Sequence, residues 1–352
     1  MKILGIETSC DETAASIIEG KGNEVKVISN IVFSQIKIHA KYGGVVPEVA
    51  AREHVVNIIP VIEKALKKAK INPDNIKAQL DGIAVTIGPG LITSLQVGVE
   101  TAKVLSYVWG TPLIAVNHIE GHIYSNFINV KNKDYKNNLF PVLNLVVSGG
   151  HTSLVLMKGH GQYKIIGETL DDAAGEAFDK AAKMLGLGYP GGSIIAKNAL
   201  LANKKKIAEV TNIKLPRPML YSPNFNFSFS GLKTALLYTL KKDKAWKSRV
   251  PEYCFEFEQA IVDTLIHKTL KAAIKYKANT IMLAGGVSCN EALREQLAIA
   301  ITKEAPAVKF YSPDLNYTTD NAAMIATIGY FKAQRKEFTT WNKISADCNL
   351  EL

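Results

Sequence analysis

The sequence predicts a two-lobed α/β protein built on an internal duplication. The chain has 352 residues, and because a single domain usually holds about 100–200 residues, this length indicates two lobes. Two segments, Ile3–Ile18 and Leu143–Met157, resemble each other. In each, an apolar strand leads through a polar turn into a second apolar strand, which is the pattern of a β-hairpin. The recurrence of this pattern favours a duplicated fold.

The turns of the two hairpins have a composition suited to phosphate. Glu7–Thr13 reads ETSCDET and Ser148–Thr152 reads SGGHT. Turns rich in Gly, Ser and Thr leave backbone N–H groups and hydroxyls free to hold phosphate oxygens. For either segment alone, an ordinary hairpin without a ligand is the alternative.

Between the hairpins, the spacing of apolar residues predicts two helices and a strand. Residues 47–70 have a helical period, with Pro60 expected to kink or divide the helix. We expect this helix to pack against a sheet or a partner. Ile83–Ile87 is predicted as a strand, and Leu91–Tyr107 as a helix that follows a Gly-Pro-Gly turn.

The second half contains a candidate nucleoside site. Asp171 or Asp172 is expected to cap a helix whose carboxylates, including Asp179, share one face. A solvated helix face is the usual explanation, but the Gly-rich turn at 186–192 would let a ligand approach the backbone, and Asp179 could accept a hydrogen bond from a ribose hydroxyl. Further on, a strand at Ile281–Ala284 and a Gly-Gly turn precede a predicted capping box at Ser288–Glu291.

Composition narrows the class of protein. Lys and Arg number 42 against 32 Asp and Glu, a formal net charge of +10, so a polyanionic partner such as nucleic acid is plausible. The lysines at 64, 67, 68 and 70 either solvate a helix end or bind phosphate. The four cysteines have no C-x-x-C spacing, which favours a reducing cytoplasm. We expect no membrane span and no targeting segment.

Two histidines, His118 and His122, stand at i and i+4. On a helix both imidazoles lie on one face and can meet one metal ion. A zinc protease is disfavoured, because Glu120 lies midway between them and, at about 100° per residue, points away from the metal face. Asp320 precedes an apolar helix at 322–331 and is expected to cap it or to serve as a third ligand.

The segment Phe225–Lys233 alternates aromatic and polar residues. It is predicted to be a half-buried strand, or alternatively an aromatic surface on which unpaired bases stack.

A series of short motifs runs in order along the chain: Gly5–Thr13, Tyr42–Glu48, Gly88–Leu91, His118–His122, Val147–Thr152, Asp171–Lys180, Phe227–Thr234, Ala284–Ser288 and Thr319–Asn321. With these motifs, nearly the whole chain resembles the family of tRNA adenosine threonylcarbamoyltransferases, once described as O-sialoglycoprotein endopeptidases, and in particular its bacterial and organellar branch. Two positions depart from the commoner pattern: Cys289 stands where a small residue such as Ala is frequent, and Thr318 where Cys is frequent.

The resemblance implies the fold of actin, Hsp70 and sugar kinases, with duplicated mixed sheets in two lobes around a central cleft. We expect an N-terminal lobe at 1–130, with the metal histidines and partner-docking helices. The C-terminal lobe at 131–352 would hold the adenylate-binding turns, and its last helix is expected to pack back on the N-terminal lobe.

The implied reaction moves the threonylcarbamoyl group of threonylcarbamoyl-adenylate onto N6 of the adenosine 3′ of the anticodon, in tRNAs that read A-starting codons. It would release AMP. The implied partners are tRNA, a smaller paralogue of the same fold and a P-loop ATPase, with no membrane.

The family pattern also implies the roles of individual residues. His118, His122 and Asp320 would be the metal ligands, for one Fe(II) ion or alternatively Zn(II). Asp11 and Glu12 are candidates for positioning or proton transfer, although both could simply hydrogen bond within the hairpin. The expected substrate-binding residues are Val146, Val147, Ser148, Gly149, Gly150, Asp179, Gly192 and Asn290.

Two other functions remain open from the sequence. An ATP-dependent phosphotransferase or ATPase of the same fold would release ADP, but such enzymes hold Mg²⁺ with carboxylates and water rather than with paired histidines. A noncatalytic partner subunit of the same fold would not be expected to keep the ligand set intact.

Overall fold

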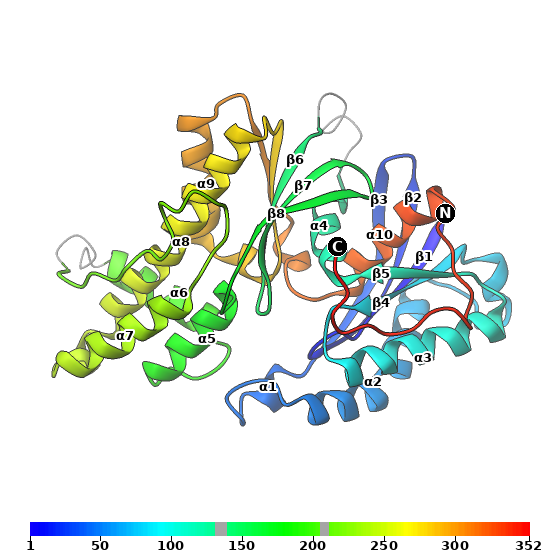
Figure 1. Cartoon of the computed structure of the whole chain (residues 1–352). Coiled ribbons are helices and arrows are strands. Elements are labelled where there is room, and N and C mark those ends of the chain that lie inside the picture. Colours follow the sequence, from blue (N-terminus) through cyan, green and yellow to red (C-terminus); the bar gives the residue numbers. More distant parts are fainter. Residues whose placement is uncertain (131–138, 205–210) are drawn as a thin grey trace. The chain divides into compact units, whose positions relative to one another are not determined.

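The computed structural model describes residues 1–130, 139–204 and 211–352 (Figure 1). The chain divides into two compact units. The first comprises Met1–Asn137 together with Pro313–Leu352, and the second comprises Asn138–Ser312. Thus the C-terminal segment from Pro313 belongs to the first unit. The sequence-based division at residue 130 placed this segment in the C-terminal lobe, with its last helix expected to pack back on the N-terminal lobe. The polar segment at 129–138 lies mostly outside the described residues.

The first unit is built on a five-stranded mixed sheet of order β3-β2-β1-β4-β5. The hairpin β1–β2 and its neighbour β3 are antiparallel, whereas β4 and β5 add in parallel. Because β1, β4 and β5 run parallel, their carboxyl ends meet at one edge of the sheet. The strands are β1 (Lys2–Glu7), β2 (Glu12–Lys21), β3 (Glu24–Ser34), β4 (Gly82–Gly88) and β5 (Leu113–Asn117).

Helices cover both faces of this sheet. Leu4 and Ile6 of β1 face a core shared with α2 (Pro47–Lys68) and α3 (Ile92–Trp109). The opposite face carries α10 (Ala322–Gln334), which lies so close to Gly5 that an added Cβ would stand 2.3 Å from the carbonyl oxygen of Ala322. Period-two alternation along β1 explains this division between the two faces. The remaining helices of the unit are α1 (Ile36–His39), α4 (His118–Tyr124), η1 (Pro73–Ala78), η2 (Ser125–Phe127) and η7 (Leu315–Tyr317).

The second unit repeats the topology of the first. Its sheet has the order β10-β9-β6-β7-β8, which is the first sheet's order in reverse when equivalent strands are matched. Again the hairpin strands and their neighbour are antiparallel, and the last two strands add in parallel. The predicted internal duplication is confirmed. The strands are β6 (Val142–Val147), β7 (Thr152–Gly159), β8 (Gln162–Glu168), β9 (Thr280–Ala284) and β10 (Lys309–Tyr311).

The helices of the second unit form one core with its sheet. Leu143 and Leu145 of β6 pack with Phe178 and Phe257 in that core. The helix between β9 and β10 corresponds to α3 between β4 and β5, so the duplication extends beyond the hairpins. The helices are α5 (Ala174–Met184), α6 (Gly191–Lys204), α7 (Ser230–Lys242), α8 (Val250–Lys275), α9 (Glu291–Glu304), η5 (Trp246–Ser248) and η6 (Gly286–Cys289).

The structure corrects two local predictions. Pro60 does not divide its helix, because α2 continues from Pro47 to Lys68 with the proline inside. The alternative, a kink at Pro60, stays a prediction. The segment around Phe227 is not a strand, although Phe227 forms one isolated β-bridge with Thr169. Its rings at Phe225, Phe227 and Phe229 are buried in the core, so they cannot offer a surface to bases.

Candidate functional site

The two histidines lie on a short helix with a defined start. The side chain of Asn117 caps α4, accepting a hydrogen bond from the backbone N–H of Ile119 at 2.8 Å. His118 and His122 are 6% and 0% exposed. Their ring centroids are 4.6 Å apart, so the i, i+4 spacing places both imidazoles side by side on one face of the helix, as predicted.

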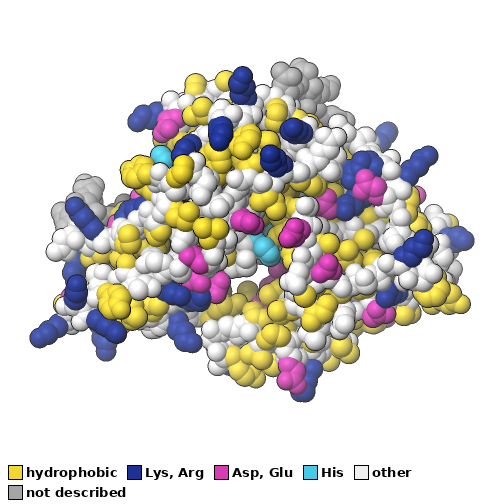
Figure 2. Space-filling model, in the orientation of Figure 1, with side chains coloured by type: hydrophobic (Ala, Val, Ile, Leu, Met, Phe, Trp, Pro, Cys, Tyr) yellow, Lys and Arg dark blue, Asp and Glu magenta, His cyan; other side chains and the backbone are white. Residues whose placement is uncertain are grey.

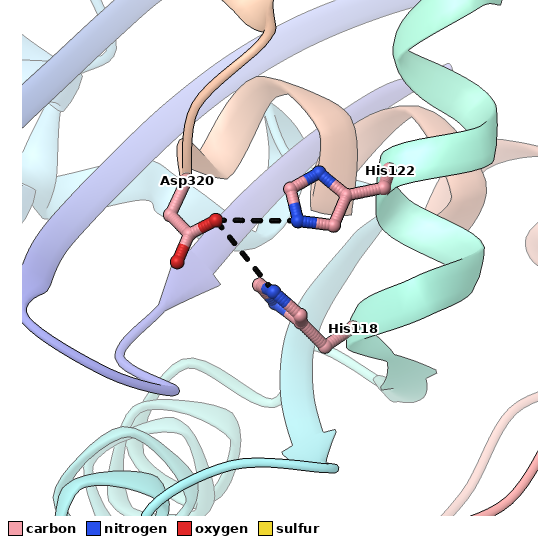
Figure 3. Close-up of side chains that lie close together, drawn as sticks. All are labelled: His118, His122 and Asp320. Atoms are coloured by element: carbon pink, nitrogen blue, oxygen red, sulfur yellow. Dashed lines mark ion pairs between the residues drawn. The ribbon is translucent and has the colours of Figure 1, made fainter. Parts of the chain in front are cut away.

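Asp320 completes a three-residue cluster. Asn321, rather than Asp320, caps α10, because the Asn321 side chain accepts from the N–H of Met324. The Asp320 carboxylate faces the histidines instead, and its Oδ1 lies 3.3 Å from His122 Nε2 and 3.6 Å from His118 Nε2 (Figure 3). One ligand atom from each of the three residues lies within 4.8 Å of the others. All three residues belong to the first unit.

The imidazole of His118 is held from its other side by Glu7, the last residue of β1. Glu7 Oε2 and Ser9 Oγ each lie 3.1 Å from His118 Nδ1. Glu7 is itself fully buried, and it accepts hydrogen bonds from the Ser9 N–H and the Thr86 hydroxyl. This contact leaves His118 Nε2 directed at Asp320, the arrangement in which a carboxylate orients a metal-binding histidine.

The buried charges of His118 and Glu7 shift each other's pKa. Burial alone would lower the pKa of His118, but the carboxylates of Glu7 and Asp320 outweigh it and raise this pKa to about 9. Burial would raise the pKa of Glu7, yet its ion pair with His118 leaves that pKa lowered. A divalent cation would therefore compete with a proton for His118.

The residues present fit a metal ion. Neither ring nitrogen of His122 has a hydrogen-bond partner, although both are buried. A buried polar atom left without a partner costs about 1–3 kcal/mol, and coordination of Nε2 would remove that cost for one of them. Two imidazoles and one carboxylate are the donor set of mononuclear Fe(II) sites and of many Zn(II) sites.

Asp11 and Glu12 lie at the start of β2 in the same unit. Asp11 is buried, and Glu12 Oε1 accepts a hydrogen bond from the Ser34 hydroxyl at 2.9 Å. Burial, together with the nearby charges of Asp11 and Asp320, raises the pKa of Glu12 well above its usual value. Glu12 is therefore easier to protonate than an ordinary glutamate.

Glu120 takes no part in this cluster. Its carboxylate is buried and pairs with Lys332 Nζ of α10 at 2.7 Å. A carboxylate tied in this way is not available as the general base of a zinc protease, which agrees with the argument from helical geometry.

In the second unit, the predicted substrate-binding residues from Val146 to Gly150 lie at the end of β6, whereas Asp179 lies on α5, Gly192 at the start of α6 and Asn290 at the cap of α9. Val146 and Val147 close β6, and the turn Ser148–Gly150 leads into β7. The N–H groups of Gly175 and Glu176, at the start of α5, donate to the carbonyls of Ser148 and Gly149. The structure thus packs the start of α5 directly against the predicted phosphate turn.

Asp179 and Asn290 both have structural contacts. Asp179 Oδ1 accepts from the N–H of Gly191 at 2.6 Å and so joins α5 to the start of α6. Asn290 caps α9 through Oδ1, while its amide donates to buried Glu258 at 2.6 Å. The predicted capping box is corrected in one respect: the cap is Asn290, whereas Ser288 lies within η6.

The glycines of this region fall into two groups. An added Cβ at Gly175 would stand 2.5 Å from the Ser148 carbonyl oxygen, and one at Gly191 would stand 2.6 Å from Asp179 Cα. An added Cβ at Gly149 or Gly150 would meet no atom within 4 Å, and one at Gly192 would meet only Phe178 Cβ at 4.0 Å. Close packing explains the first group but not the second.

Comparison with known proteins identifies the family. The model of the tRNA N6-adenosine threonylcarbamoyltransferase family matches residues 26–327. A tRNA N6-adenosine threonylcarbamoyltransferase of Desulfitobacterium hafniense is 49% identical over 97% of this chain and 95% of the relative. One from Thermomicrobium roseum is 48% identical over 95% of this chain and 93% of the relative. The chain belongs to the tRNA N6-adenosine threonylcarbamoyltransferase family.

Membership of this family makes the chain a transferase enzyme. Its fold is shared more widely: the crystal structure of T. kodakarensis HypF aligns with a TM-score of 0.55 at 12% identity, over 95% of this chain and 48% of that one. The duplicated mixed sheets are those of the predicted actin-like class.

Glu7 of this transferase is a site residue that was not predicted from the sequence. A signal was present, because Glu7 is the one charged residue after Lys2 in the apolar strand KILGIE. Buried carboxylates are rare unless they are paired, so a Glu at the end of a buried strand indicates a nearby cation or imidazole.

The transferase uses Asp171 differently from the prediction. The start of α5 has no side-chain cap, and Asp171 instead accepts from the N–H of Phe229 and Ser230 and from both flanking serine hydroxyls. Asp172 binds Lys180 and Lys233. The motif at 227–234 is therefore accounted for by packing: it anchors the start of α7.

The C-terminal tail of the transferase contacts the start of α4, the helix that carries His118 and His122. The Asn117 amide, whose oxygen caps α4, donates to the carbonyls of Leu350 and Glu351 at 3.4 and 3.2 Å. The tail therefore restrains the start of the helix that carries both histidines.

Proposed function

We propose that this transferase moves the threonylcarbamoyl group from threonylcarbamoyl-adenylate to N6 of the adenosine 3′ of the anticodon, in tRNAs reading A-starting codons. A bond forms between N6 and the carbamoyl carbon, the bond from that carbon to the adenylate phosphate oxygen breaks, and AMP leaves. The observation that supports this proposal most is the cluster of two buried histidines, His118 and His122, with the half-buried Asp320 in a chain of this family.

His118, His122 and Asp320 would hold one Fe(II) ion, with Zn(II) as the alternative. When bound there, such an ion supplies Lewis acidity to the adenylate's carbamoyl group. Glu7 keeps the His118 ring in the orientation that this binding needs, since it occupies the other ring nitrogen.

Asp11 and Glu12 would divide the proton transfers. Glu12, whose pKa is raised, would hold a proton and donate a hydrogen bond to an oxygen of the substrate. Asp11, buried beside it, would accept the proton that N6 loses as the new bond forms. The raised pKa of Glu12 supports this division of roles.

The turn Val146–Gly150 would hold the phosphate or acyl region through backbone N–H groups. Asp179, Gly192 and Asn290 would surround the adenosine. The open space around Gly149, Gly150 and Gly192 supports this assignment, because the missing side chains serve no packing within the unit.

Beyond tRNA, we infer two protein partners: a smaller paralogue of the same fold and a P-loop ATPase, in a cytoplasmic complex without a membrane. The paralogue would dock on α2. Val55, Val56 and Ile59 of that helix are 64%, 68% and 47% exposed, and exposed apolar side chains gathered on one helix are typical of an interface. No described helix is both long and apolar enough to span a bilayer.

The test is transfer of labelled threonylcarbamoyl from its adenylate to unmodified tRNA, with the partner proteins and Fe(II) or Zn(II) present. We expect label on the anticodon-loop adenosine with wild type, and loss of label with His118→Ala. His267→Ala, which removes an exposed histidine of α8, is the matched control and should retain transfer. Release of ADP and a phosphorylated acceptor instead of AMP would favour the phosphotransferase alternative and overturn the proposal.

A further inference from the structure

Almost all of the protein's net positive charge belongs to one unit. The second unit, residues 138–312, contains 23 Lys and Arg against 14 Asp and Glu, a net charge of +9. The first unit contains 19 against 18, a net charge of +1. A surface that binds a polyanion is therefore to be sought on the second unit.

Within that unit, four lysines follow one another where α7 ends and α8 begins. Lys241, Lys242, Lys244 and Lys247 are all exposed, and no ion pair found among the described residues involves them. The carboxylate that lies between them, Asp243, accepts hydrogen bonds from Arg249, from the Tyr253 hydroxyl and from the N–H of Ala245. The charge of these lysines is therefore not compensated locally. Figure 2 shows Lys and Arg side chains along the lower left edge, where Figure 1 places the end of α7.

Two aromatic residues lie among these lysines. Tyr238 is 58% exposed, and Lys241 Nζ stands 5.8 Å from its ring centroid. Trp246 is half-buried, and Lys247 Nζ stands 6.0 Å from its ring. Lysines that contact phosphates beside rings that stack on bases are the combination found in surfaces that bind unpaired nucleic acid.

Complementing a helix dipole does not account for this set. Lys241 and Lys242 lie in the last turn of α7 and could do so. Lys244 and Lys247 lie beyond the end of the helix, in the connection to α8, where the dipole no longer acts.

We propose that Lys241, Lys242, Lys244 and Lys247, with Tyr238 and Trp246, form a docking surface for tRNA, here named the α7–α8 lysine surface. The lysines bind backbone phosphates, and the two rings stack on exposed bases or riboses. The inference rests on the proposed function, since it takes tRNA as the acceptor, and it adds the part of the protein that holds the tRNA body.

The test replaces all four lysines by glutamine and measures the affinity for unmodified tRNA by fluorescence anisotropy at several salt concentrations. Each phosphate contact contributes about 0.7–0.9 to the slope of log K against log salt. We expect the slope to fall by about 3, and the Kd at 0.1 M salt to rise at least about tenfold.

The matched control removes the same charge from α2 and the residues after it, by replacing Lys64, Lys67, Lys68 and Lys70, which are also exposed, with glutamine. This variant should keep the wild-type slope to within about one contact. Equal losses in both variants would show a general effect of net charge and overturn the proposal, as would an unchanged slope in the α7–α8 variant.

A third variant separates stacking from charge. Tyr238→Leu together with Trp246→Leu should weaken tRNA binding about tenfold or more, since each stacked base contributes about 1–3 kcal/mol, while leaving the salt slope unchanged. Unchanged binding would show that the two rings do not contact tRNA. Circular dichroism of each variant, compared with wild type, checks that it is folded.

The transfer assay distinguishes failure of this inference from failure of the proposed function. We expect the α7–α8 variant to show a raised KM for tRNA with kcat retained. If wild type modifies tRNA and this variant has an unchanged KM, the docking surface is wrong and the function stands. If wild type binds tRNA through this surface without modifying it, the function is wrong and the surface stands.

Discussion

At the scale of single residues, the orientation of His118 depends on a side chain on its far side. Glu7 occupies His118 Nδ1 while holding hydrogen bonds from Ser9 and Thr86. A fully buried carboxylate with its oxygens engaged in this way cannot rotate freely, so it fixes the ring that it contacts.

Glu7→Gln should therefore weaken metal binding about 10- to 100-fold, the usual cost of losing a partner of this kind. Competition with a coloured chelator measures the affinity directly, without reference to activity. Glu12→Gln changes a neighbouring carboxyl group that does not contact His118, and it should leave the affinity much closer to that of wild type. An unchanged affinity in Glu7→Gln would mean that packing alone orients His118.

Substitutions of glycines should separate substrate contact from packing. Gly149→Ala should leave the free energy of unfolding within about 0.5 kcal/mol of wild type, as for surface changes that disturb nothing, because its Cβ enters open space. Binding of a nonhydrolysable adenylate analogue should fall at least tenfold, measured by calorimetry. Gly175→Ala is the matched change and should destabilise the fold. Normal binding by Gly149→Ala would remove this turn from the substrate site.

At the scale of elements, α8 carries an unusual buried lysine. Lys268 is fully buried and donates to the Ser222 hydroxyl and the Asn224 carbonyl, so it fastens the segment before Phe225 to the helix. No carboxylate of the described residues forms an ion pair with it. Burial, with a smaller contribution from Lys271, lowers the pKa of Lys268 to about 8.

The lowered pKa predicts a pH dependence of stability. The unfolded chain, in which a lysine has a pKa of about 10.4, binds more protons than the folded chain between pH 8 and 10.4, so the stability contributed by Lys268 rises with pH across that window. Lys268→Met cannot titrate. The thermal midpoint of wild type should therefore rise relative to that of Lys268→Met from pH 8 to 10, and the two should stay parallel below pH 7. A constant difference across the whole range would contradict the shifted pKa.

Elements were predictable from the sequence where a local pattern decides them. The hairpins, the helix at 92–109 and the i, i+4 histidines follow from periodicity and spacing. Choices between neighbouring polar residues were not predictable: Asn321 and not Asp320 caps α10, and Asn290 rather than Ser288 caps α9. These choices depend on where the tertiary fold directs each side chain, which a propensity does not contain.

At the scale of the whole molecule, the cluster of His118, His122 and Asp320 joins distant parts of the chain. His118 and His122 follow β5, while Asp320 arrives with the C-terminal segment, whose helix α10 packs across the first sheet. Sequence spacing could pair the histidines but not add Asp320, because that contact depends on α10 packing close against Gly5 of β1. The local pattern left Asp320 as either a helix cap or a third ligand, and the resemblance to a known family favoured the ligand.

Because the three side chains come from distant segments of the first unit, a bound ion should stabilise that unit as a whole. An ion that binds the folded state alone adds about 2.7 kcal/mol at a free concentration of 100 times its Kd, so Fe(II) added anaerobically, or Zn(II), should raise the thermal midpoint of wild type. Asp320→Ala should lose most of that rise, and so should His122→Ala, although the two residues lie on different elements. A chelator should reverse the rise in wild type. An equal rise in Asp320→Ala would mean that the ion binds elsewhere, and the three side chains would then be a buried polar cluster with no metal to hold.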